Sequence, residues 1–318
     1  MTTTSTAPKA PSVTDTPEDR ALKAKHAAMW ASGSYPTVVE DVVAPLGGIL
    51  VDVVDVQPGQ RVLDVAAGTG TSALPAARRG AEVVATDLTP ELLDVGRAAA
   101  AAEGLQLTWE TADAEALPYD DAAFDVVLSA IGVMFAPHHQ QAADELVRVC
   151  RPGGTVAVLS WTPEGFIGQL FATMKPYAPP PPAGASPAPL WGRADHVRGL
   201  FGDRVTDLVA HQQTLRVDRF ATGAEFRDFF KANYGPTIAV YRFIAEDPAK
   251  VEALDADLAA LGDRFVPRRD HGLGVPARDR STGLTRSATR CGGRLAAPAP
   301  DRLSNGSSRN RGVWRDTG

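Results

Sequence analysis

A glycine-rich turn between a predicted strand and a predicted helix is the segment best suited to chemistry. Residues 62–77 read VLDVAAGTGTSALPAA. Such a turn leaves backbone N–H groups free for a ligand at the start of the helix. The stretch from Gly68 to Ala73 also satisfies the dinucleotide pattern GxGxxA, which is weak evidence alone because many α/β proteins place glycines here. The loop therefore indicates a ligand site without naming the ligand.

The charge of Asp64, just before this loop, bears on which ligand binds. A pyrophosphate would lie close to that carboxylate, which is unfavourable in a partly buried site. A cofactor with an ammonium and a sulfonium, such as S-adenosylmethionine, would be attracted instead. The alternative is that Asp64 is a solvated or capping carboxylate.

Three further polar positions follow the next predicted strands. Asp87 ends the second strand, where an acid accepts hydrogen bonds from ribose hydroxyls in both NAD and adenosylmethionine sites; a helix N-cap is the alternative role. Asp113 and Ala114 follow the third strand, where a carboxylate and a backbone N–H can reach an adenine ring. Ser129 ends the fourth strand, at the edge where open α/β sheets bind ligands.

Alternating strands and helices must position these residues. The predicted strands RVLDVAA, AEVVATD, LQLTWETAD, FDVVLSA and TVAVLSW lie between residues 61 and 161 and are separated mostly by helical patterns. Repeated strand–helix units of this length predict a parallel sheet with right-handed crossovers. We therefore expect an α/β fold with a doubly wound, Rossmann-like, mostly parallel sheet and helices on both faces.

Residues 60–161 resemble the class I S-adenosylmethionine-dependent methyltransferases. Within that family they are similar to the small-molecule, ubiquinone/menaquinone-type branch. The resemblance rests on a DxxxGxG loop, an acid ending strand two, an Asp-Ala pair after strand three, FDVV at strand four and an RPGG turn before strand five. One departure is Ala66, where the family usually has its first glycine. Because alanine there needs only an unstrained φ, we expect this difference to matter little.

The resemblance implies S-adenosyl-L-methionine as the cofactor and transfer of its methyl group to a small-molecule acceptor by in-line displacement, mainly through positioning. It implies a cofactor-binding role for Asp64, Ala66, Gly68 and Gly70 around the methionine part, Asp87 and Leu88 at the ribose, Asp113 and Ala114 at the adenine, and Ser129 near the transferring methyl. Tyr35 is expected to fold over the cofactor as part of a lid.

A general base would be needed if the acceptor were a hydroxyl compound. His138 and His139, just past strand four, are the candidates, with a capping and surface role as the alternative. No metal site is expected, because these histidines, His211 and Cys150 show no metal-ligand spacing. Six aromatic residues are expected either to line an apolar acceptor pocket or to pack in the core: Trp161, Trp191, Phe226, Phe229, Phe230 and Tyr234.

Five segments are expected along the chain. Residues 1–20 read as a disordered N-terminus, 21–56 as a helical cap, 57–161 as the cofactor-binding core, and 162–265 as acceptor-side helices with a sixth strand. Residues 266–318 read as an Arg/Gly/Pro-rich disordered tail. It holds 11 Arg and no Lys, which is typical of GC-rich DNA translated in the wrong frame, whereas an RNA-binding tail would mix in lysine or repeat an aromatic.

We therefore expect a frameshift between about Asp263 and Asp270. It would leave the terminal strand of the family fold missing. That strand runs antiparallel between the fifth and sixth, so its loss would leave the fifth strand as an open edge.

Composition and charge exclude several other classes of protein. The chain is 44% hydrophobic with a net charge of −6, and nothing approaches the roughly 18 apolar residues of a membrane span. Without the tail the charge is −13, which argues against nucleic-acid binding. We expect a cytoplasmic protein without a signal peptide. Two rival functions stay open: an NAD(P)-dependent oxidoreductase, against which Asp64 and the RPGG strand argue, and a cofactor-binding protein without turnover.

Overall fold

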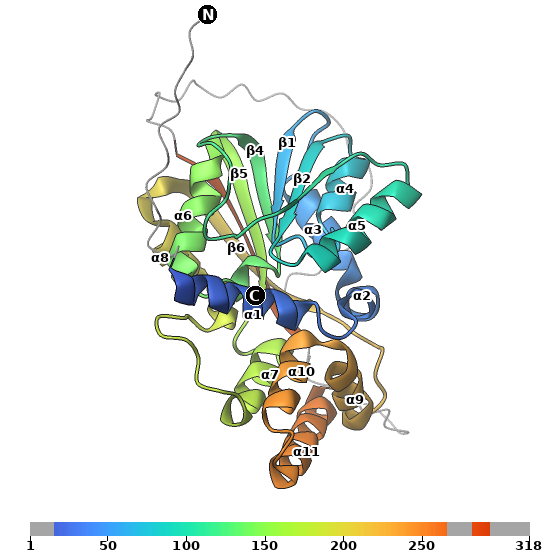
Figure 1. Ribbon diagram of the computed structural model, residues 1–318. Coiled ribbons are helices and arrows are strands. Elements are labelled where there is room, and N and C mark those ends of the chain that lie inside the picture. Colours follow the sequence, from blue (N-terminus) through green and yellow to red (C-terminus); the bar gives the residue numbers. More distant parts are fainter. Residues whose placement is uncertain (1–15, 266–281, 293–318) are drawn as a thin grey trace, which may run out of the picture.

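A single sheet organises the molecule in the computed structural model, which describes residues 16–265 and 282–292. Its strands follow the order β3–β2–β1–β4–β5–β7–β6 (Figure 1). They are β1 (Arg61–Val65), β2 (Glu82–Asp87), β3 (Thr108–Thr111), β4 (Phe124–Ala130), β5 (Cys150–Trp161), β6 (Val205–Leu215) and β7 (Thr282–Cys291). The first five pair in parallel, and β7 runs antiparallel to both neighbours.

Helices lie on both faces of this sheet, so the predicted doubly wound α/β fold is confirmed. Within the core, α3 (Ala44–Val53) packs on α4 (Ala73–Arg78), α5 (Pro90–Ala102) packs on β2 and β3, and α6 (His139–Val149) packs on α8 (Ala194–Phe201). The helical segment that precedes β1 buries Val38, Val42, Val43 and Leu46 in the core. No helix in the described part of the chain is long and apolar enough to cross a membrane.

A second group of helices lies beyond one end of the sheet. It consists of α7 (Phe166–Met174), α9 (Gly223–Asn233), α10 (Gly235–Phe243) and α11 (Pro248–Phe265), with α11 packed on both α7 and α9 (Figure 1). The N-terminal α1 (Pro17–Trp30) crosses the same end and contacts α10, and the short α2 (Tyr35–Val38) follows it. The end that α1 crosses is the one where the parallel strands finish, so these helices stand where open α/β sheets bind ligands.

The start of α1 corrects one expectation. Residues 17–20 were expected to be disordered, yet the helix begins at Pro17. The side-chain oxygen of Thr16 accepts the Asp19 N–H at 3.1 Å, and Pro17 stands at the first helical position, where its missing N–H is not needed. Two acids, Glu18 and Asp19, complement the helix dipole in the first turn. Residues 1–15 lie outside the described structure.

The position of β7 corrects the expectation of a missing terminal strand. Residues 282–291 occupy the place between β5 and β6, with register pairs such as Ala157 with Ala288 and Val209 with Ala288. Ser287, Thr289 and Cys291 are buried at alternate positions. Small polar residues at that spacing carry no hydrophobic signal, so the unpaired edges of β5 and β6 decide the conformation rather than local pattern. Residues 266–281 and 293–318, which hold the rest of the expected tail and most of the interval in which the frameshift is expected, lie outside the described residues.

The RPGG segment departs from expectation in a smaller way. Arg151, Pro152, Gly153 and Gly154 were predicted to form a turn, but they belong to β5. The pairing of β4 with β5 shifts register there, between Phe124 and Val126, and Gly153 has φ +77°. The segment is thus an irregular start of the strand, which a glycine in the left-handed region makes possible.

Candidate cofactor site

A cavity opens at the carboxyl ends of β1, β2 and β4, beneath α1. It encloses about 820 Å³, counting the solvent at its mouth. Six of the predicted cofactor residues line it: Ala66, Gly68, Asp87, Leu88, Asp113 and Ala114. Asp64, Gly70 and Ser129 lie behind this surface. The sheet therefore brings most of the predicted site together in one cavity, from segments that are far apart in the sequence.

The glycine loop follows β1 with two glycines in the left-handed region. Gly68 has φ +55° and Gly70 φ +84°. A Cβ on Gly70 would lie 2.7 Å from the Trp109 ring, so this position needs glycine for space as well as for φ. A Cβ on Gly68 would meet only the Tyr35 ring, at 3.6 Å. The Gly68 backbone is thus open to the cavity, and the Tyr35 ring lies near it; the lid role of Tyr35 stays a prediction.

Ala66 departs from the expectation of an unstrained φ. Its φ is +53°, in the left-handed region that costs a non-glycine residue roughly 1–2 kcal/mol. The chain turns there against Gly132, on which a Cβ would stand 2.2 Å from the Ala66 carbonyl oxygen. The positive φ explains why glycine, the family's usual residue, suits position 66, and the close approach explains the glycine at position 132.

Asp87 connects the end of β2 to the loop. One of its oxygens accepts the Gly68 N–H at 2.8 Å, and the other accepts the Thr89 N–H at 2.8 Å. Burial raises the pKa of Asp87, while these backbone donors oppose the shift. A carboxylate oxygen can accept more than one hydrogen bond, and Asp87 lines the cavity, so it can still accept from a ligand hydroxyl.

Asp64 lies behind the loop and is only 1% exposed. Neither oxygen has a hydrogen-bond partner among the described residues; the Ala73 and Ser72 N–H groups are close enough to favour the charged form but lack hydrogen-bond geometry. Burial raises the pKa of Asp64 to about 7. An orphaned buried carboxylate of this kind suits a cationic ligand group and not a phosphate.

Ser129 has a structural role in this conformation. Its hydroxyl donates to the Val65 carbonyl at 2.7 Å and accepts the Val133 N–H at 2.9 Å, and the side chain is fully buried. The hydroxyl thereby fixes the end of β4 to the end of β1. Its successors, Ala130 to Gly132, line the cavity in its place.

A charged cluster holds α1 over the cavity. The ammonium of Lys23 contacts Asp19 at 2.8 Å, Glu115 at 2.9 Å and Asp113, and its side chain is 9% exposed. Burial alone would lower the pKa of Lys23, but the hydrogen bonds to these three carboxylates raise it. The lysine thus joins α1 to the loop that carries the predicted adenine contact, Asp113.

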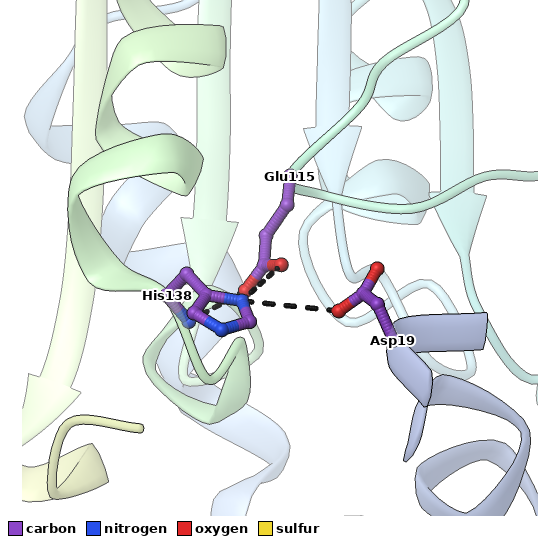
Figure 2. A group of neighbouring side chains, drawn as sticks. All are labelled: Asp19, Glu115 and His138. Atoms are coloured by element: carbon purple, nitrogen blue, oxygen red, sulfur yellow. Dashed lines mark hydrogen bonds and ion pairs between the residues drawn. The ribbon is translucent and has the colours of Figure 1, made fainter. Parts of the chain in front are cut away.

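His138 completes this cluster from the start of α6. Figure 2 shows Asp19, Glu115 and His138 pointing toward one another from three separate elements. The His138 ring lies 2.9 Å from Glu115, and its backbone N–H donates to the same carboxylate at 2.6 Å. Three such side chains could hold a metal ion, but the Lys23 ammonium already lies against both acids, where it supplies a positive charge. We therefore assign the cation's place to Lys23.

The histidines predicted as candidate bases do not line the cavity. His138 belongs to the Lys23 cluster, and His139 is 2% exposed, with its Nδ1 2.9 Å from His196. Burial, with His196 adding to it, lowers the pKa of His139 to about 4. The six aromatic residues that were expected either to line an acceptor pocket or to pack in the core are all buried, and none of them lines the cavity. They therefore belong to the core.

The cavity-facing side of α1 was not among the predicted parts of the site. Lys23, His26 and Trp30 line the cavity from one helical face, at spacing i, i+3 and i+7. Trp30 packs edge-on against Tyr35 at 5.4 Å and Phe135 at 4.7 Å between ring centroids. The spacing could have been read from ALKAKHAAMW, but only the fold shows that this helix crosses the end of the sheet.

Comparisons with known proteins agree with this geometry. Residues 62–154 match the family model described as a methyltransferase domain. Two uncharacterized proteins of Mycobacterium tuberculosis are 54% and 53% identical to the chain, covering 79% and 80% of it and 93% and 92% of their own lengths. A demethylmenaquinone methyltransferase of Thermus thermophilus is 42% identical over 35% of the chain and 53% of its own length.

Two solved structures share the fold at low identity. The [4+2]-cyclase SpnF aligns with a TM-score of 0.50 and 19% identity over 78% of this chain and 81% of its own. A methyltransferase candidate from Bacillus halodurans C-125 aligns with a TM-score of 0.50 and 20% identity over 78% and 99%. At these identities the structures show the fold alone, and the domain match adds the family. The chain belongs to the class I S-adenosylmethionine-dependent methyltransferases.

Proposed function

We propose that the chain binds S-adenosyl-L-methionine in the cavity beneath α1 and transfers its methyl group to a small-molecule acceptor. The observation that carries the proposal is the convergence of the open Gly68 backbone, Asp87 and Asp113 on one cavity. The orphaned carboxylate of Asp64 behind the loop supports a cofactor with cationic groups. NAD(P) would instead bring a pyrophosphate toward that carboxylate.

When bound, the cofactor supplies a sulfonium-activated methyl group. The chain's own residues then have to bind, orient and exclude water. Asp87 would hold the ribose hydroxyls while keeping the loop N–H of Gly68, and Asp113 and the Ala114 backbone would hold the adenine. Trp30 and Tyr35 would cover the methyl-transfer side and keep water out. Alignment of donor and acceptor can contribute about 7–11 kcal/mol to the rate, so little further chemistry is required of the protein.

Isothermal titration with S-adenosylmethionine, S-adenosylhomocysteine and NADH tests the cofactor. Both sulfur ligands should bind, and Asp87→Asn should weaken them at least tenfold. Asp94→Asn is the matched control, because this substitution removes the same charge from an exposed position on α5. Binding of NADH in place of the sulfur ligands would refute the proposal.

Turnover needs a separate assay, because one protein with this fold is a [4+2]-cyclase. Release of S-adenosylhomocysteine in the presence of an acceptor panel should exceed the acceptor-free background. Tight cofactor binding without turnover on any acceptor would favour a cofactor-binding protein instead.

A further inference from the structure

The cavity-facing side of α1 carries an imidazole that forms no hydrogen bond with any described residue. Lys23 is held by its three carboxylates, and Trp30 packs against Tyr35 and Phe135. His26, between them, lines the cavity and makes no hydrogen bond within residues 16–265 and 282–292. Its ring nitrogens are therefore available to a molecule in the cavity.

The surroundings of His26 keep this imidazole neutral at neutral pH. Burial lowers the pKa of His26; the carboxylate of Glu115 opposes the shift, and the ammonium of Lys23 adds to it. The other titratable groups on the cavity are Asp87, Asp113 and the Tyr35 phenol, whose own pKa is raised by burial and by Asp87. A neutral imidazole has a lone pair and can accept a proton.

We propose that His26 is the general base of the methyl transfer and that the acceptor is a planar hydroxyl compound, a phenol or an enol, held against Trp30 and Phe135. The inference rests on the proposed function and adds to it a catalytic residue and an acceptor class. In the step, the bond between the methyl carbon and sulfur breaks as the bond between that carbon and the acceptor oxygen forms. The hydroxyl proton passes to His26, the products are a neutral thioether and a neutral ether, and His26 returns the proton to water.

The strength of the base sets the acceptor class. An imidazole with a lowered pKa is a weak base, so it matches a hydroxyl that is itself acidic. Phenols and enols are far more acidic than aliphatic alcohols, because the ring or the double bond spreads the charge. The lining of the cavity also suits a planar acceptor, because Trp30 and Phe135 are flat aromatic side chains and Ile131 is apolar.

Two naphthols separate the proton transfer from the rest of the reaction. 1-Naphthol must lose a proton during methylation, whereas 4-nitro-1-naphthol is ionised at pH 8 before it binds. We expect His26→Gln to lower kcat for 1-naphthol by about 10²–10⁴-fold and to leave 4-nitro-1-naphthol nearly unchanged. The wild-type kcat for 1-naphthol should rise with pH as His26 loses its proton, and the kcat of the variant should lack this rise. His211→Gln, at an exposed position on β6, is the matched control.

Two measurements do not depend on turnover. Imidazole NMR of the wild type with S-adenosylhomocysteine should show a neutral His26 whose resonances shift when 1-naphthol is added. Titration of His26→Gln with S-adenosylmethionine should give the wild-type affinity, which also shows that the variant is folded.

Equal loss on both naphthols, an unshifted His26 resonance, or a wild type that methylates 1-naphthylmethylamine and neither naphthol would overturn this inference alone. Failure of the wild type to bind S-adenosylmethionine would overturn the proposed function beneath it.

Discussion

Gly47 of α3 lies directly against the carbonyl oxygen of Thr71 in the glycine loop. A Cβ on Gly47 would stand 2.0 Å from that oxygen and 2.6 Å from the Ser72 nitrogen, far inside van der Waals contact. The adjacent Gly48 has nothing within 4 Å of its own hypothetical Cβ. A helix outside the cavity therefore supports the loop that forms its floor, and only one of two neighbouring glycines makes that contact.

Gly47→Ala should displace the loop, while Gly48→Ala should not. We expect Gly47→Ala to lower the unfolding free energy by about 1–3 kcal/mol and to weaken S-adenosylmethionine at least tenfold, because the added methyl pushes on backbone. Gly48→Ala should be neutral or stabilising by up to about 1 kcal/mol, since alanine is the better helix former. Denaturant unfolding and calorimetric titration measure both effects. Equal behaviour of the two variants would contradict a supporting role for Gly47.

The parallel part of the fold could be predicted because its signals are local. Strand, turn and helix alternate within short windows, and glycines and acids end the strands where ligands bind. Gly68 and Asp87 reach the cavity for that reason. Strand β7 gave no such signal, since Ser287, Thr289 and Cys291 are small, and the strand partners that order them are 77–133 residues earlier in the chain.

The unpredicted parts of the site depend on distant contacts. Lys23 meets Asp113 across 90 residues, and nothing in either segment indicates the other. The positive φ of Ala66 follows from the approach of Gly132, which a strand pattern does not contain. His26 was passed over in favour of His138 and His139, because nearness to strand four in sequence is not nearness to the cavity.

Lys23→Met should release α1 from the cavity. Breaking a fully buried ion pair costs about 3–5 kcal/mol, and the cost here should be smaller because Asp113 is 24% exposed. Hydrogen exchange of the α1 amides should quicken at least tenfold, while the strand amides stay protected. Lys25→Met is the matched control, since Lys25 is exposed on the same helix. Unchanged α1 exchange in Lys23→Met would show that the cluster does not hold the helix.

Cofactor binding should release a proton through Asp64. Burial raises the pKa of Asp64 to about 7, so near pH 7 the free protein still carries part of that proton. A cationic ligand group favours the carboxylate and lowers this pKa. Titration with S-adenosylmethionine at pH 7 in phosphate and in Tris should therefore show proton release, which Asp64→Asn should abolish. Proton uptake would contradict the charge argument.

Asp64 should also make stability depend on pH. The folded pKa of about 7 exceeds the ordinary value of 3.8, so between these values the folded protein holds a proton that the unfolded chain has lost. Stability from this group is present below about pH 4, falls as pH rises to about 7, and is constant above. Asp64→Asn should flatten this part of the profile in thermal unfolding. A profile identical to that of the wild type would assign the slope to other groups.

The docking of β7 can be tested through two thiols. Cys150 begins β5 and Cys291 ends β7; both are buried, and each thiol lies within hydrogen-bond reach of the other. This contact raises the pKa of Cys150 and lowers that of Cys291, so the Cys291 thiolate should attack diamide, a two-electron oxidant, and the Cys150 thiol should then close the disulfide. The oxidised protein should then yield one peptide pair joined through Cys150 and Cys291 in a non-reducing digest. Cys291→Ser should give none. Crosslinking between separate chains, without the internal pair, would show that residues 282–291 do not occupy the place between β5 and β6.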